Sequence, residues 1–113
     1  MALHHAKPAE VVDLRPLGPG LKEVKSATIV KTAAFEAIRL IVAAGALIPR
    51  HEVPGSITLH CLEGRIELDL EGSALELGAN EWVYLEGGAP HAVRGIEDSS
   101  VLLTILFDAG GRA

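Results

Sequence analysis

The sequence is poor in aromatic residues, in cysteine and in clustered positive charge. One tryptophan, one tyrosine and two phenylalanines accompany a hydrophobic fraction of 49%, so the core has to be mainly aliphatic. The single cysteine, Cys61, excludes an intrachain disulfide, and its apolar neighbours predict a buried thiol in a reducing setting. The formal net charge is −5 at pH 7, without a basic run. We therefore expect neither a nucleic acid nor an anionic membrane surface as a partner.

Long hydrophobic runs are missing as well. No stretch reaches the roughly 18 apolar residues that a transmembrane helix requires, and residues 1–16 lack the apolar core of a signal peptide. We expect a cytoplasmic location. A chain of 113 residues has the size of one domain, and we expect that domain to span 1–113 with a loose segment over 1–9.

The chain is rich in turn residues and short apolar segments. Twelve glycines and six prolines divide it into short pieces. Arg65–Leu70 alternates charged and aliphatic residues, which is typical of a strand with one buried face. Further strands are predicted over 10–14, 28–32, 35–42, 47–53, 57–62, 74–77, 81–85, 91–94 and 101–107. The pattern predicts an all-β sandwich or barrel of about nine or ten strands with little helix.

Two groups of residues resemble the motifs of the cupin family, whose domains are small jelly-roll β-barrels. Gly45, His51 and Gly64 have the spacing of the first cupin motif, and Gly88 and His91 match part of the second. The resemblance covers roughly residues 35–107. It implies a jelly-roll barrel in which inward-facing histidines bind one divalent metal and a small molecule.

The departures from the family pattern concern the metal ligands. Val53 occupies the position of the second histidine of the first motif, and Ile57 occupies that of its glutamate. The resemblance therefore leaves His51 and His91 as candidate metal ligands. Catalytic zinc normally has three protein ligands, so two imidazoles would hold zinc, nickel, iron or manganese weakly or not at all.

His60 is a third candidate whose orientation the sequence leaves open. Alternation counted forward from Ile57 points His60 away from the barrel interior, whereas alternation counted back from Leu70 points it inward. A turn between the two strands can shift this parity, so both orientations remain possible.

Two classes of function follow from these observations. The first is a cupin that binds a small molecule, with or without a weakly held metal. The second is a metal-dependent enzyme of the dioxygenase or isomerase kind with an incomplete ligand set. The missing ligands favour the first class, and the sequence identifies no catalytic residue.

The sequence also predicts a homodimer. Residues 57–59 and 101–106 are mostly apolar on both faces of their strands. Because a small barrel has only one interior, the second apolar face requires a cover, and a second copy of the chain would supply it.

Overall fold

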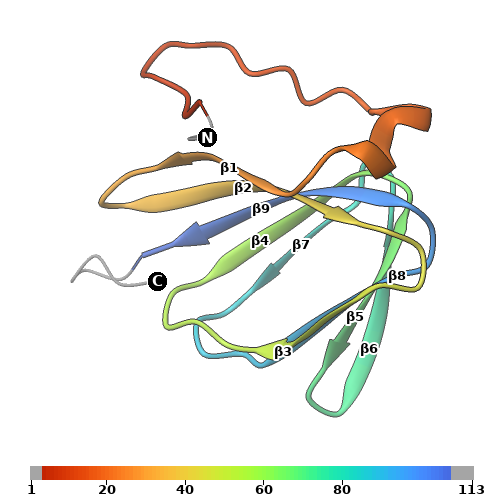
Figure 1. Ribbon diagram of the computed structural model, residues 1–113. Coiled ribbons are helices and arrows are strands. Elements are labelled where there is room, and N and C mark those ends of the chain that lie inside the picture. The colour runs from red at the N-terminus through yellow and green to blue at the C-terminus, as the bar shows by residue number, and fades with distance from the viewer. Residues whose placement is uncertain (1–3, 108–113) are drawn as a thin grey trace.

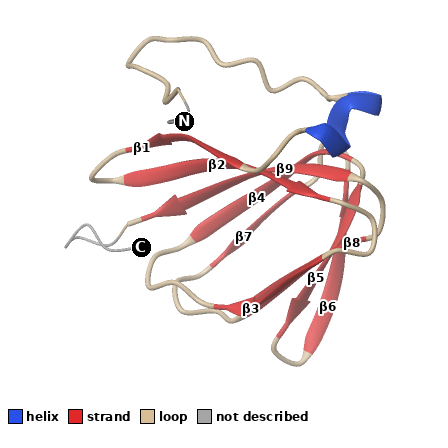
Figure 2. Cartoon of the chain, in the orientation of Figure 1, coloured by secondary structure: helices blue, strands red, loops and turns tan. Residues whose placement is uncertain are grey.

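The computed structural model describes residues 4–107, which are nearly all strand, turn and loop (Figures 1 and 2). One short 3-10 helix, η1 (Gly18–Glu23), precedes the strands. The strands are β1 (Ala27–Lys31), β2 (Phe35–Val42), β3 (Leu47–His51), β4 (Ile57–Glu63), β5 (Arg65–Leu70), β6 (Ser73–Gly78), β7 (Trp82–Leu85), β8 (His91–Gly95) and β9 (Ser99–Leu106). Within the described residues, no helix is long and apolar enough to cross a membrane.

The strands form two antiparallel sheets that face each other (Figure 1). The five-stranded sheet has the order β1-β2-β9-β4-β7, and the four-stranded sheet has the order β3-β8-β5-β6. The pairs are nested, because β5 pairs with β6, β4 with β7, β3 with β8 and β2 with β9. This nesting is the jelly-roll arrangement, so the predicted fold class is confirmed.

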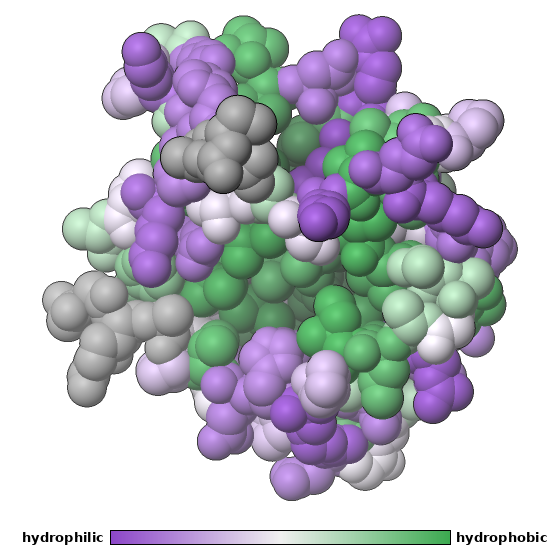
Figure 3. All heavy atoms as spheres, in the orientation of Figure 1, coloured by the Kyte–Doolittle hydropathy of each residue, from purple (hydrophilic) through white to green (hydrophobic). Residues whose placement is uncertain are grey.

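Aliphatic side chains from both sheets fill the interior. Alternation along each strand sends every second side chain inward. The buried cluster consists of Val42, Ile57, Leu59, Cys61, Ile66, Leu68, Leu77, Leu85, Val93, Val101 and Leu103. In Figure 3, hydrophobic residues gather in the hollow centre between the two sheets, with hydrophilic residues around them. Each fully buried large aliphatic side chain contributes about 1.5–3 kcal/mol to stability, so this cluster dominates the folding energy.

The predicted strand over residues 10–14 is wrong. These residues are extended but pair with no strand, and Val11 is 94% exposed. Residues 4–17 instead form a strap along the outside of the five-stranded sheet, here called the N-terminal strap. Between residues 4–14 and β1, the backbone contact is the Ala6 N–H, which donates to the Ile29 carbonyl. A strand needs a continuous hydrogen-bonded partner, and this segment has none.

Glu63, at the end of β4, fastens the far end of the N-terminal strap. Its carboxylate accepts hydrogen bonds from the Leu17 N–H at 2.7 Å and the Gly18 N–H at 3.1 Å. The Ser100 hydroxyl donates a third at 3.1 Å. These hydrogen bonds lower the pKa of Glu63 against the opposing effect of burial, which is the largest single influence on it. The strap is therefore tied to the sheet mainly near its two ends.

Gly64 makes the tight connection between β4 and β5. Its φ is +83°, a left-handed conformation that glycine adopts at low cost. A Cβ atom at this position would collide with the Ser99 side chain and the Asp98 carbonyl. Gly72 has the same φ of +83° but open space around it.

These two glycines form a matched pair for mutation. Gly72→Ala should lower the free energy of unfolding by about 1–2 kcal/mol, the cost of a left-handed alanine. Gly64→Ala should lower the free energy of unfolding by about 1–3 kcal/mol more than Gly72→Ala does, because the collision adds an overpacking penalty. Urea denaturation of both variants measures the difference, and equal losses would contradict the steric argument.

Candidate metal and ligand site

The pairing of β3 with β8 brings two distant histidines together. His51 and His91 are register partners across this pair. Their ring centroids lie 4.4 Å apart, with 57° between the ring planes. His91 is only 3% exposed, whereas His51 lies at the exposed rim. The structure thus places the two histidines side by side, although 40 positions separate them in the sequence.

A β-bulge in β3 turns His51 toward His91. Ile48 pairs with Val93 and His51 pairs with His91, so three steps along β3 match two along β8. Without the extra residue, Ile48 and His51 would point to opposite faces. Pro49 lies within the bulge and has no N–H to give to a regular ladder, which favours an irregular pairing there. The bulge therefore gives Ile48 and His51 the same face.

Both imidazoles are held by a backbone carbonyl two residues earlier in the chain. Nδ1 of His51 lies 3.1 Å from the Pro49 carbonyl oxygen, and Nδ1 of His91 lies 3.0 Å from that of Ala89. A carbonyl only accepts, so each neutral ring carries its proton on Nδ1. Each Nε2 then keeps a lone pair for a metal or a hydrogen-bond donor. The sequence analysis did not predict these two carbonyl contacts. Their common feature is that each carbonyl belongs to the residue two positions before its histidine.

The environment of His91 favours its neutral form. Burial is the largest cause and lowers its pKa below 6.5; the hydrogen bond with the Ala89 carbonyl opposes this, and the neighbouring His51 lowers the pKa further. A neutral imidazole is the form that coordinates metals and accepts hydrogen bonds. His91 can therefore bind a metal cation or accept a hydrogen bond from a ligand.

The two remaining ligand positions of the motif carry apolar side chains in this chain. Ile57 is buried in the core cluster, and Val53 packs against that cluster. Within residues 4–107 no group of three or more His, Cys, Asp and Glu side chains lies close enough together to hold a metal ion. The pair therefore offers two imidazole nitrogens, without a third metal-ligating side chain among the described residues.

His60 lies away from this pair. Along β4, Ile57, Leu59 and Cys61 are buried, while the residues between them are only partly buried. The register partners of His60 are Trp82 and Leu102 on the outer face of the five-stranded sheet. A register shift between Cys61 and Glu63 changes the parity before β5 begins. His60 therefore points away from the barrel interior, as alternation counted forward from Ile57 predicts.

The fold and the paired histidines define a small jelly-roll barrel with one buried imidazole and one at the rim. Residues 38–107 match the family model described as the cupin domain, and the chain belongs to that family.

Three relatives illustrate the range of similarity. An uncharacterised protein of Aquifex aeolicus is 34% identical over 58 residues, which are 51% of this chain and 48% of that protein. The chain thus matches about half the length of this curated relative. A cupin superfamily protein from Desulfitobacterium hafniense DCB-2 has a TM-score of 0.75 at 17% identity, covering 91% of this chain and 100% of that one. The DMSP lyase from Ruegeria pomeroyi DSS-3 has a TM-score of 0.68 at 22% identity, covering 85% and 53%. These two structures share the fold with this chain.

The lowered pKa of His91 predicts a specific acid sensitivity in the metal-free protein. The folded pKa lies below the unfolded value of about 6.5, so the unfolded chain takes up the proton first as the pH falls. The free energy of unfolding should therefore decrease below that pH, by at most about 1.4 kcal/mol per pH unit from this one proton. Urea denaturation between pH 5 and pH 8, with a chelator present, measures the slope.

His91→Gln is the control for this prediction. Glutamine does not titrate, so the variant should lose this part of the slope while keeping the contribution of the other groups. Parallel curves for the two proteins would contradict the assignment to His91.

Proposed function

We propose that this cupin binds a small molecule in its barrel through His51 and His91, with a divalent metal held weakly if at all. The observation that carries the proposal is the fixed orientation of both rings, in which each Nδ1 faces a carbonyl and each Nε2 is left to accept. Two hydrogen-bond acceptors of fixed orientation in an aliphatic barrel would bind a ligand through few polar contacts and would fix its orientation.

The two rings and the aliphatic interior of the barrel indicate the chemistry of the ligand. Neutral imidazoles attract a hydrogen-bond donor or a cation, whereas a carboxylate or phosphate would require positive charge. The partly buried residues that pack against the core are Ile38, Leu40, Ile48, Val53, Leu70, Leu75, Val83, Ala89 and Ile105. We therefore infer a ligand with an apolar body and one hydroxyl or amine donor.

The ring separation also bears on which metal would fit. With metal–nitrogen bonds of about 2.1 Å and a ring radius of about 1.1 Å, centroids 4.4 Å apart correspond to a nitrogen–metal–nitrogen angle near 90°. A tetrahedral angle would need a separation of about 5.2 Å. The observed spacing is thus compatible with two cis ligands of one octahedral or tetragonal ion, such as nickel, iron or manganese, when both Nε2 atoms turn toward it.

Metal affinity should respond to the two missing ligands. The natural protein should bind nickel or manganese weakly, and Val53→His with Ile57→Glu should tighten binding by roughly a hundredfold or more, since it adds two direct ligands. His91→Ala should abolish the natural affinity. Calorimetry on the three proteins, purified without a histidine tag, measures these affinities.

The metal-free double variant provides the control. Ile57 is 2% exposed, so an unpaired glutamate at this position should lower the free energy of unfolding by several kcal/mol until metal is added. If the natural protein binds one equivalent as tightly as the double variant, the proposal of a weak two-histidine site fails.

A metal-dependent enzyme of the dioxygenase or isomerase kind is the second candidate. The near-90° spacing favours it, because octahedral ions retain open positions for a substrate beside two cis ligands. The lyase with the same fold is a precedent for catalysis on such a barrel. Substrate turnover that requires added metal and disappears in His91→Ala would support the enzyme over the binding protein.

We also propose that the protein is a homodimer in the cytoplasm, joined through the bare half of the five-stranded sheet. This face is formed by the outward residues Thr58, His60, Leu62, Trp82, Tyr84, Leu102, Thr104 and Leu106. None of them is charged, and Trp82 remains 59% exposed. The four-stranded sheet instead places Glu67 opposite Glu76 and Arg94 on its outer face. Two copies of a chain with net charge −5 repel each other, so an uncharged face is where they can meet most easily. A two-fold axis would pair this face with itself.

Light scattering during gel filtration tests the dimer. The natural chain should elute with twice its own mass at micromolar concentration, and Trp82→Glu should shift it to the monomer, because an unpaired charge would enter the interface. Ala74→Glu adds the same charge to the exposed β6 strand of the other sheet and should leave the dimer intact. A natural chain that is monomeric would refute the proposal.

A further inference from the structure

A channel runs beneath the N-terminal strap, outside the barrel. Two cavities of about 300 and 380 Å³ lie between the strap and β1–β2. Both are lined by Ala6, Glu10, Val12 and Ile29, so they adjoin, and the two together are here called the channel. The His51–His91 pair takes no part in its lining.

Apolar side chains line most of the channel. The 380 Å³ cavity is bounded by Pro8, Val12, Ile29, Val30 and Phe35. The 300 Å³ cavity continues this lining with Leu14 and Val24. Apolar walls with a few polar groups are typical of small-molecule sites, and they favour an aliphatic body in the ligand.

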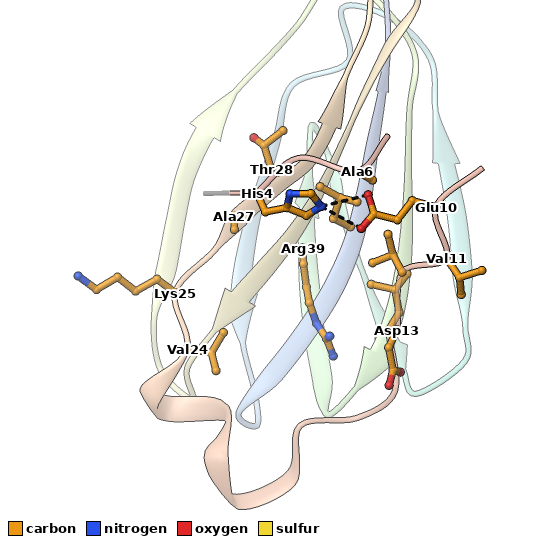
Figure 4. A pocket seen from close by; sticks show the side chains of 13 residues that line it. His4, Ala6, Glu10, Val11, Asp13, Val24, Lys25, Ala27, Thr28 and Arg39 are labelled. Atoms are coloured by element: carbon orange, nitrogen blue, oxygen red, sulfur yellow. Dashed lines mark hydrogen bonds and ion pairs between the residues drawn. The ribbon is translucent and has the colours of Figure 1, made fainter. Parts of the chain in front are cut away.

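Arg39 marks the polar end of the channel (Figure 4). Its side chain is 13% exposed, and Nη2 donates to the Arg15 carbonyl at 2.7 Å and the Ser100 hydroxyl at 3.4 Å. Nε is buried without a hydrogen-bond partner, and it is the only such side-chain atom within residues 4–107. A buried charged donor without a partner is unusual and calls for an acceptor that a ligand could supply.

The carboxylates in the channel wall already have donors of their own. Asp13 accepts from the Arg15 backbone N–H at 3.0 Å and pairs with Arg15 Nε at 2.7 Å. Glu10 lies 2.9 Å from His4 Nε2, the contact drawn across the mouth in Figure 4, and accepts from the Lys7 N–H. These carboxylates are therefore occupied, and neither is hydrogen-bonded to Arg39.

Glu63 only partly neutralises Arg39. Its nearest oxygen lies 3.9 Å from Arg39 Nη2, too far for a hydrogen bond, while it accepts from Leu17, Gly18 and Ser100. The free hydrogen-bonding capacity at this end of the channel is thus a cationic donor. The matching ligand group is an anionic acceptor.

We propose that the channel binds a medium-chain aliphatic carboxylate, with its head at the Arg39 guanidinium, whose buried Nε is reached when the strap yields, and its tail beneath the N-terminal strap toward Phe35. Arg39 and Phe35 lie on the same face of β2, four residues or about 13 Å apart, which sets the length of the chain. Residues 4–14 hold to β1 by the Ala6–Ile29 hydrogen bond, so the strap can yield as the ligand enters and meets the guanidinium. The proposal is independent of the barrel function.

Octanoate is the probe, with octan-1-ol and butyrate for comparison. Calorimetry should give one octanoate per chain, and octanol should bind roughly tenfold or more weakly because it lacks the charge that Arg39 recognises. Butyrate should also bind more weakly, since it leaves the channel half filled. In nitrogen-15 NMR spectra, octanoate should shift the Arg39 Nε–H signal and the Ala6 and Ile29 amides.

Three variants locate the ligand. Arg39→Lys keeps the charge but removes Nε, and should weaken octanoate binding roughly tenfold. Val12→Trp fills the channel from the strap without touching the Glu63 contacts, and should abolish binding. Leu47→Trp makes the same kind of change at an exposed leucine on β3 and should leave binding unchanged.

Specific outcomes would overturn the proposal. These are an absence of octanoate binding to the natural chain, octanol binding as tightly as octanoate, or unchanged binding to Val12→Trp. Loss of octanoate binding in His91→Ala would instead place the ligand in the barrel. Nickel affinity reports on the His51–His91 pair and should be unchanged in Val12→Trp. This measurement distinguishes the barrel site from the channel.

Discussion

The antiparallel pairing of β3 with β8 is the constraint on which the candidate site depends. It is one level of the nested jelly-roll pairing, enclosed by β2–β9 and enclosing β4–β7 and β5–β6. Because the levels are nested, an error of register between β3 and β8 would strain the connections to their neighbours. The bulge at Pro49 adds one residue at this level, and that residue turns His51 toward His91.

On the resemblance to the cupin motifs, Val53 and Ile57 stand at two ligand positions, so the barrel would lack two donors of a full metal site. Each replaces a donor with hydrocarbon, and a hydrocarbon wall also disfavours the ordered water that could take a ligand's place. What remains is a pair of imidazoles fixed by the Pro49 and Ala89 carbonyls. Burial lowers the pKa of the deeper ring, His91, and so favours its neutral, accepting form.

The outer face of the five-stranded sheet is divided between two environments. Over β1 and β2, the N-terminal strap covers it and leaves a channel that ends at Arg39. Over β4, β7 and β9 the outward residues are uncharged, and the described part of the strap does not extend over Trp82 and Tyr84, which are more than one-third exposed. The strap ends at the Glu63 carboxylate, at the end of β4. The two proposals for this face, a carboxylate ligand and a second copy of the chain, therefore concern different surfaces.

The sequence by itself determined most of the strands, the aliphatic core and the apolar character of Val53 and Ile57. The alternation of Arg65–Leu70 is a local property, and so are the substitutions at Val53 and Ile57. Tertiary structure decided which face His60 occupies and left residues 10–14 without a strand partner. It also decided the ring orientations and the position of Arg39 under the strap. The physical reason is that side-chain periodicity is set within one strand, whereas register, bulges and edge pairing depend on hydrogen bonds between backbones far apart in the chain.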